Sequence, residues 1–131
     1  MSLTDLHFPS VIGHRGAAAR APENTLAGFR VAKSLGCIWV EFDVRLTGDS
    51  VLVVCHDDRL ERTTSGRGAI SKLPIATIRE LDAGGWFDAR FAGERVPTLD
   101  ETLTLCRELD LGVNVEIKAE RCQGRAAAGA V

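Results

Sequence analysis

The sequence lacks several features that would assign a protein to a class at once. No apolar run approaches the roughly 20 residues that a membrane-spanning helix needs. The N-terminal segment MSLTDLHFPS has neither the apolar stretch of a signal peptide nor a twin arginine. The net charge is only -2, from 16 Lys and Arg against 18 Asp and Glu, which leaves no basic excess for nucleic acid. We therefore expect no membrane span and no nucleic-acid partner.

Closely spaced cysteines are also missing. The chain has 4 cysteines in 131 residues, and none forms a Cys-x-x-Cys pair. Cys37 and Cys55 fall within apolar, strand-like segments, where a thiol usually packs as a small hydrophobic group. This spacing argues against a disulfide framework or a zinc site and predicts a reduced, cytoplasmic protein.

The chain does contain an alternation of strand and helix signals. Asn24 or Thr25 is a suitable helix N-cap, and Thr98 and Glu101 match a capping box. In chain order the pattern predicts a strand at 11–13, a helix at 25–35, strands at 37–46 and 51–56, a helix from Thr98 to Gly112 and a strand at 113–118. This βαβαβ order is typical of an α/β fold with a parallel sheet. The irregular segment 57–97 is long for a connection and is interpreted as a functional excursion or small subdomain.

The turn at 47–50 is too short for a parallel crossover, so the strands on either side should form a hairpin. A two-residue loop at Gly48-Asp49 would place Glu41 directly opposite His56. Opposed side chains of an antiparallel pair have Cβ atoms about 5 Å apart. The pattern therefore predicts a histidine beside the carboxylates of this strand.

Carboxylates lie near the carboxyl ends of successive predicted strands. Glu41 and Asp43 share one face of a strand, and Glu116 lies on the corresponding face of the next barrel strand. Carboxylates held this close raise each other's pKa unless a cation neutralises them. Three carboxylates suit a hard divalent ion such as Mg²⁺ or Ca²⁺. The alternative is ordinary surface charge, which the apolar residues flanking this face disfavour.

Histidines and cations accompany the carboxylates. His14 and His56 could supply an acid and a base for displacement at a phosphodiester, since imidazole titrates near neutral pH. Arg15 carries a guanidinium fork that fits phosphate bidentately. Lys118 could add a point charge to the phosphate, or it could simply end its strand.

Together these residues resemble the glycerophosphodiester phosphodiesterase family, part of a wider group of barrel enzymes similar to phosphatidylinositol phospholipase C. The matching segments are His14-Arg15-Gly16, Pro22-Glu23-Asn24-Thr25, Glu41-Phe42-Asp43-Val44, Leu46-Thr47, Asp49, His56-Asp57, Pro97-Thr98-Leu99 and Glu116-Ile117-Lys118. They follow the family's order and spacing from about Val11 to Lys118. The resemblance implies a TIM-type (β/α) barrel with a small inserted subdomain after the second strand, which is 57–97 here.

The resemblance also implies an activity and roles for the site residues. The activity is metal-dependent hydrolysis of glycerophosphodiesters to sn-glycerol 3-phosphate and an alcohol, with a glycerol hydroxyl as internal nucleophile and a cyclic phosphate that water opens. The implied metal ligands are Glu41, Asp43 and Glu116. The implied acid–base pair is His14 and His56, and the implied phosphate contacts are Arg15 and Lys118.

Length is the one departure from the family, because an eight-unit barrel needs about 250 residues. The 131 residues correspond to a partial barrel domain of about three βα units. An unpaired strand edge would remain, so we expect either a shortened gene product or self-association that covers the edge. The alternatives to an active enzyme are an inactive fragment that retains metal or phosphate binding, and a related phospholipase-like phosphodiesterase.

Overall fold

The computed structural model describes residues 11–118. Its elements are, in order, β1 (Gly13–His14), α1 (Leu26–Ser34), β2 (Trp39–Leu46), β3 (Leu52–Val54), η2 (Ile70–Lys72), α2 (Ile75–Ile78), η3 (Ala89–Phe91), α3 (Leu99–Glu108) and β4 (Gly112–Ile117). No helix among these is long and apolar enough to cross a membrane.

A small sheet centred on β2 organises the described chain. β1 and β4 both pair with β2 in parallel, and β3 pairs antiparallel with the end of β2. The carbonyl of Asp43 accepts from Cys55 beyond β3, whereas the carbonyl of Val44 accepts from Lys118 beyond β4. Because consecutive carbonyls of a strand point to opposite edges, β4 lies on one edge of β2, and β1 and β3 share the other.

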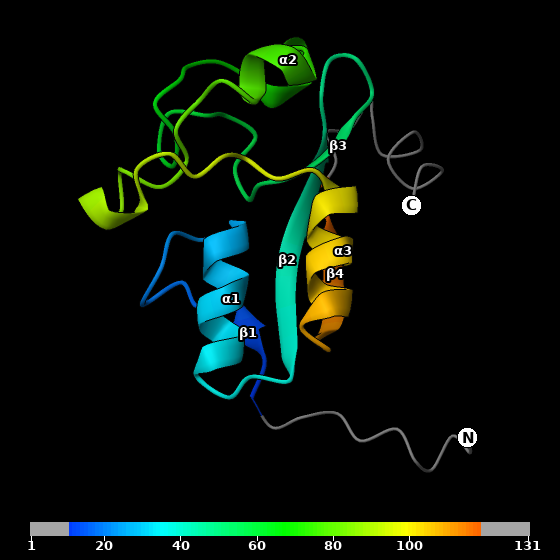
Figure 1. Ribbon diagram of the computed structural model, residues 1–131. Coiled ribbons are helices and arrows are strands. Elements are labelled where there is room, and N and C mark those ends of the chain that lie inside the picture. The colour runs from blue at the N-terminus through cyan, green and yellow to red at the C-terminus, as the bar shows by residue number, and fades with distance from the viewer. Residues whose placement is uncertain (1–10, 119–131) are drawn as a thin grey trace.

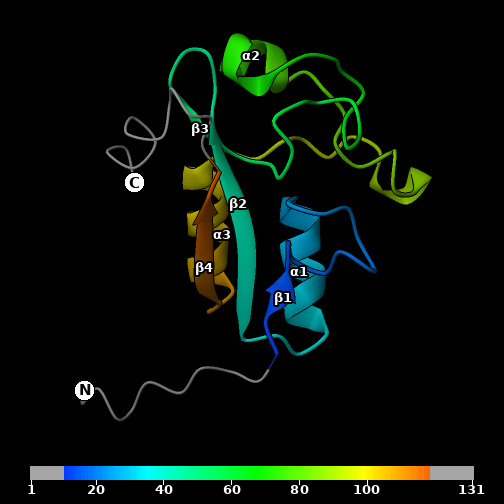
Figure 2. The same cartoon turned by 180° about the vertical axis from the view of Figure 1, so that it is seen from behind.

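Helices α1 and α3 cover one face of this sheet, while the face seen in Figure 2 carries no helix among residues 11–118. The buried core lies between helices and sheet, where Phe29 of α1 meets Phe42 of β2 edge-on with ring centroids 5.6 Å apart. Every second residue of β2 points into this core, as a half-buried strand requires. The intervening residues of β2 are thereby turned to the opposite face, which carries the charged side chains.

Local capping explains where both long helices begin. The Thr25 hydroxyl accepts from the Gly28 amide at 3.0 Å, and the Thr98 hydroxyl accepts from the Glu101 amide at 3.2 Å. Of the two N-caps that the sequence allowed, the first helix therefore uses Thr25. The predicted C-terminus of the second helix was wrong, because α3 ends at Glu108 and Gly112 is already the first residue of β4.

The hairpin between β2 and β3 forms as expected, but in a different register. Its loop has three residues, closed by the Thr47 amide donating to the Val51 carbonyl at 2.9 Å. Ser50 supplies the left-handed residue of this loop, with φ of 65°. The extra residue shifts the pairing by one position, so Val44 faces Val54. The predicted opposition of Glu41 and His56 is therefore wrong.

The segment from His56 to Pro97 forms an excursion with its own core, beyond the carboxyl ends of the parallel strands (Figure 1). Its buried apolar residues, together with those of β3, are Val53, Cys55, Leu60, Ile70, Ile78, Ala83 and Val96. Asp49 in the hairpin loop accepts from the first amide of α2, that of Ile75, at 2.9 Å. The excursion returns to its starting point, since the Val54 amide donates to the Pro97 carbonyl at 2.8 Å.

Candidate active site

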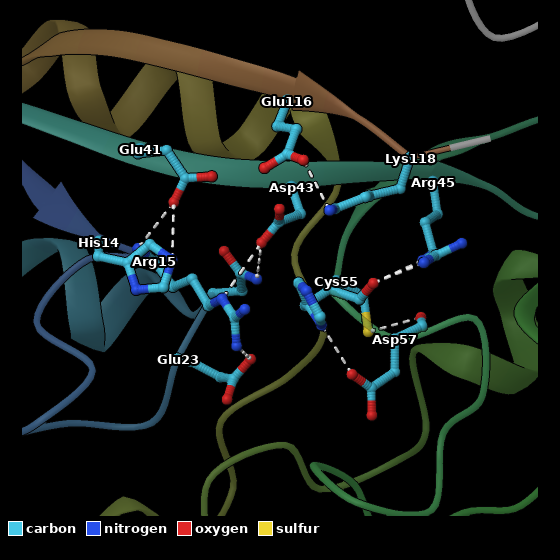
Figure 3. A network of polar contacts seen from close by, with 12 residues as sticks. His14, Arg15, Glu23, Glu41, Asp43, Arg45, Cys55, Asp57, Glu116 and Lys118 are labelled. Carbon is cyan, nitrogen blue, oxygen red and sulfur yellow. Dashed lines mark hydrogen bonds and ion pairs between the residues drawn. The ribbon is translucent and has the colours of Figure 1, made fainter.

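The sheet brings the three predicted carboxylates together. Asp43 of β2 pairs in register with Glu116 of β4, and Glu41 lies two residues earlier on the same face. One carboxylate oxygen from each lies within 4.8 Å of the others. The Asp43 side chain is 1% exposed, whereas that of Glu116 is 52% exposed. Figure 3 shows the cluster where β2 and β4 run side by side.

The electrostatics of this cluster favour a cation. Burial raises the pKa of Glu41, and the neighbouring charge of Asp43 raises it further. The Oε1 atom of Glu41 is buried without a hydrogen-bond partner. A hydrogen bond from Lys118, whose Nζ lies 2.6 Å from Oε1 of Glu116, lowers the pKa of Glu116. An orphaned carboxylate oxygen beside two further carboxylates fits a hard divalent ion.

Arg15 reaches the carboxylates from the loop after β1. Its backbone is left-handed, with φ of 53°, and its amide donates to Oε2 of Glu41 at 3.2 Å. Its guanidinium donates through Nη1 to Oε2 of Glu23 at 3.0 Å, while Nε lies 3.6 Å from Oδ2 of Asp43. A strained backbone held by such contacts is typical of a functional site. The exposed His14 ring lies nearby, with Nε2 3.8 Å from Oε2 of Glu41.

Asn24 fixes one oxygen of Asp43. Its Nδ2 donates to Oδ2 of Asp43 at 3.1 Å, and its own backbone is left-handed with φ of 55°. Its backbone amide donates to the Arg15 carbonyl at 2.9 Å. Asparagine suits the position because it tolerates this backbone conformation and carries a neutral donor.

His56 comes from the chain just after β3. Its Nδ1 lies 2.8 Å from Oδ1 of Asp57, and its carbonyl accepts from Arg45 through Nε at 2.9 Å and Nη2 at 2.6 Å. Hydrogen bonds from Arg62 hold the pKa of Asp57 well below its usual range, so Asp57 is ionised and only accepts. Neutral His56 must then carry its proton on Nδ1, which leaves the lone pair of Nε2 free.

The structure thus joins the predicted carboxylates with His14, Arg15 and Lys118, while His56 arrives with a separate group of charged residues. The sequence-based reasoning missed five residues that hold the site: Glu23, Asn24, Arg45, Asp57 and Arg62. Two of them had visible signals, because Arg45 alternates with Asp43 on one strand face and Asp57 adjoins His56. Glu23 and Asn24 were noted as part of a helix start and of a segment that matches the family, but they were given no role in the site. Nothing local marks Arg62, whose partner Glu23 is 39 residues away.

Comparison with known proteins identifies the family. Residues 14–128 match the model of the glycerophosphoryl diester phosphodiesterase family. The chain belongs to this family. A curated family member from Caldanaerobacter subterraneus, named glycerophosphodiester phosphodiesterase, is 48% identical over 109 residues, which are 83% of this chain and 45% of that protein.

Solved structures of this family share the fold. A phosphodiesterase from Oleispira antarctica, solved with the product sn-glycerol 3-phosphate, superposes with a TM-score of 0.91 at 43% identity, covering 93% of this chain and 49% of that one. A glycerophosphodiester phosphodiesterase from Agrobacterium tumefaciens gives 0.81 at 40% identity, covering 94% and 53%. These structures are TIM-type barrels, which confirms the predicted fold class. The chain spans about half the length of the relatives it matches.

Proposed function

We propose that this chain provides the metal and histidine portion of an active site that hydrolyses glycerophosphodiesters to sn-glycerol 3-phosphate and an alcohol. The observation that carries the proposal is the cluster of Glu41, Asp43 and Glu116, with ligand atoms within 4.8 Å of one another. The product bound to the Oleispira antarctica relative supports the choice of substrate class.

Glu41, Asp43 and Glu116 would hold the metal, with Mg²⁺ and Ca²⁺ as the two candidates. When bound, such an ion would neutralise negative charge that develops on the phosphate oxygens. Lys118 now neutralises Glu116, and a cation at the carboxylates would replace it in that task. Lys118 would then join Arg15 in contacting the phosphate, since both are cations beside the cluster.

The histidines would move the protons. His56 presents an unprotonated Nε2 because Asp57 accepts from Nδ1, so it suits the base that takes the proton of a glycerol hydroxyl. The freed oxygen would attack phosphorus while the bond to the alcohol breaks, and His14 would give that alcohol its proton. Water would then open the cyclic phosphate with the proton transfers reversed. The tethered nucleophile gives the first step its advantage of proximity.

We further propose that residues 1–131 form part of one barrel domain, with 57–97 as a subdomain that borders the site. Residues 1–10 and 119–131 lie outside the part that the structure describes. Self-association at the open edge of β4 and a cytoplasmic location stay predictions. So do the two alternatives, an inactive fragment that retains metal or phosphate binding and a phospholipase-like specificity.

A direct assay tests the proposed activity. Purified chain loaded with Mg²⁺ or Ca²⁺ should release sn-glycerol 3-phosphate from glycerophosphocholine, and EDTA should abolish the release. Lipid vesicles that contain phosphatidylinositol are the comparison substrate, and cleavage of these alone would favour the phospholipase-like alternative. A folded, metal-binding sample without either activity would identify the inactive fragment.

A further inference from the structure

Arg62 in the excursion contacts two segments that carry residues of the site, the loop between β1 and α1 and the chain just after β3. Its guanidinium donates through Nη1 to Oε1 of Glu23 at 2.8 Å and through Nη2 to Oε2 at 3.0 Å. It also donates through Nε to Oδ2 of Asp57 at 2.9 Å and through Nη2 to Oδ1 at 3.0 Å. All three guanidinium nitrogens are therefore engaged with two carboxylates from different loops.

Each of these carboxylates holds a different residue of the site. Asp57 accepts from His56 Nδ1 at 2.8 Å, and Glu23 accepts from Arg15 Nη1 at 3.0 Å. The side chains of Glu23 and Asp57 are 9% and 26% exposed, so Arg62 neutralises two largely buried charges. Arg62 thus stands between the proposed base and a proposed phosphate contact without touching either.

The arrangement depends on the shape of a guanidinium as well as on its charge. A planar fork can give parallel hydrogen bonds to two carboxylates at once, whereas an ammonium is a compact point charge. The two hydrogen bonds from Nε and Nη2 of Arg62 fix the plane of the Asp57 carboxylate. That plane determines where the His56 ring can donate to it. Arg62 also donates to both oxygens of Glu23, the carboxylate that accepts from Arg15.

We propose that Arg62 is a positioning residue that sets the tautomer of His56 through Asp57 and the availability of Arg15 through Glu23. Its importance for turnover rests on the proposed function, but its effect on the two side chains does not. Without Arg62, Asp57 is free to turn toward water, and the full charge of Glu23 falls on Arg15. His56 should then exchange between both neutral tautomers, and Arg15 should bind anions less well.

The test is nuclear magnetic resonance of the histidine ring nitrogens in the full chain at mildly alkaline pH. The His56 signals are identified with a His56→Gln variant. Wild type should show mainly the Nδ1–H form, and Arg62→Gln should show a mixture of tautomers. Arg62→Lys retains a charge between the carboxylates and should be intermediate. The matched control is Arg59→Gln, since Arg59 is an exposed arginine of the same excursion whose guanidinium donates to nearby Glu61.

Two further readouts accompany the ring signals. Affinity for inorganic phosphate should fall about two- to fivefold in Arg62→Gln, the size expected for losing a partly exposed ion pair. Turnover should fall about 10- to 100-fold, as is typical when the partner of a functional residue is removed. Arg59→Gln should match wild type in every measurement.

Unchanged His56 tautomers in both folded Arg62 variants would overturn the proposal, whatever their activity. If Arg62→Gln does not fold by circular dichroism, Arg62→Lys decides the same question. If the wild-type chain releases no sn-glycerol 3-phosphate, the proposed function fails for this chain, while the ring-nitrogen comparison still decides the role of Arg62.

Discussion

The two groups of carboxylates around this site are stabilised in opposite ways. Glu41 and Asp43 project from the same face of β2, where hydrogen bonds of the sheet hold them close despite their like charge. Glu23 and Asp57 project from loops, and arginines neutralise each of them. Burial and Asp43 raise the pKa of Glu41. For Glu23, burial would raise the pKa as well, but the hydrogen bonds and charges of Arg62 and Arg15 outweigh it and lower the pKa.

This difference separates two tasks. In the strand-borne group, the like charges of Glu41 and Asp43 repel each other, and a bound cation would relieve that repulsion. The stability that the repulsion costs the metal-free protein would therefore add to its affinity for a metal. The loop-borne group is already neutralised, so it can hold side chains in place whether or not a metal is bound. Variants that act on one group only test this difference between the two groups.

The largest effect is expected from His14→Ala or His56→Ala. Either change should lower kcat for glycerophosphocholine about 100- to 10,000-fold, the range for loss of a general acid or base. Metal affinity measured by calorimetry should stay near the wild-type value, because neither imidazole is proposed as a ligand. His7→Ala is the control, since it removes the remaining histidine of the chain, for which no role is proposed. Loss of metal binding in either variant would place that histidine among the ligands.

Glu41→Gln is expected to lower metal affinity strongly and, without metal, to raise thermal stability. Affinity for Mg²⁺ or Ca²⁺ should fall about 100-fold as one ligand charge is lost. In EDTA, however, the melting temperature should rise, because the repulsion with Asp43 is removed. The folded protein holds the Glu41 proton to higher pH than the unfolded chain, so the wild type should lose stability relative to the variant as pH rises above about 4.5.

Glu23→Gln is the mirror experiment on the loop-borne group. The pKa of Glu23 is lowered in the folded state, so its ionised form stabilises the protein above the ordinary value of 4.5. The variant should melt lower than wild type at neutral pH, by about 1 kcal/mol in free energy of unfolding. The difference should vanish as pH falls below that value. Parallel pH profiles for Glu23→Gln and Glu41→Gln would contradict the comparison.

A moderate effect is expected from Asn24→Gly, which keeps the left-handed backbone but removes the donor to Asp43. Metal affinity should weaken about 10-fold, because Asp43 loses the bond that orients it. Ala19→Gly, in the same loop, controls for added backbone freedom. Wild-type affinity in Asn24→Gly would show that the hydrogen bond from Asn24 does not orient Asp43 for the metal.

The smallest effect is expected from Ser50→Gly in the hairpin loop. Removing a side chain from a residue with φ of 65° should stabilise the protein by about 0.5–1 kcal/mol, measured by urea unfolding. Metal affinity and turnover should not change, since the loop lies at the end of the hairpin away from the carboxylates. Destabilisation would contradict the three-residue loop and its register.

Regular periodicity made much of the fold and the carboxylates predictable. Alternation along β2 placed Glu41 and Asp43 on one face, and the parallel pairing of β4 brought Glu116 alongside without any loop geometry. The neighbourhood of His56 was predicted from an incorrect register, because one additional loop residue changes every opposed pair in a hairpin.

The interactions of the loops could not be predicted in the same way. Arg62 and Glu23 meet because two irregular segments fold over the ends of the strands, and no local pattern specifies that approach. The left-handed backbones of Arg15 and Asn24 are likewise held by tertiary contacts, since neither residue is a glycine. Such contacts are visible only in three dimensions.

The close return of the excursion to its starting point has a consequence for how such enzymes diversify. Because Val54 and Pro97 are hydrogen-bonded to each other, the part of the excursion that follows His56 and Asp57 could be exchanged or resized while the strands on either side stay in place. The corresponding segment of a relative that acts on a different glycerophosphodiester could then be grafted in its place. Such a graft would have to keep the arginine that reaches Glu23 and Asp57, as well as the contacts of the excursion with Asp49 and Glu101.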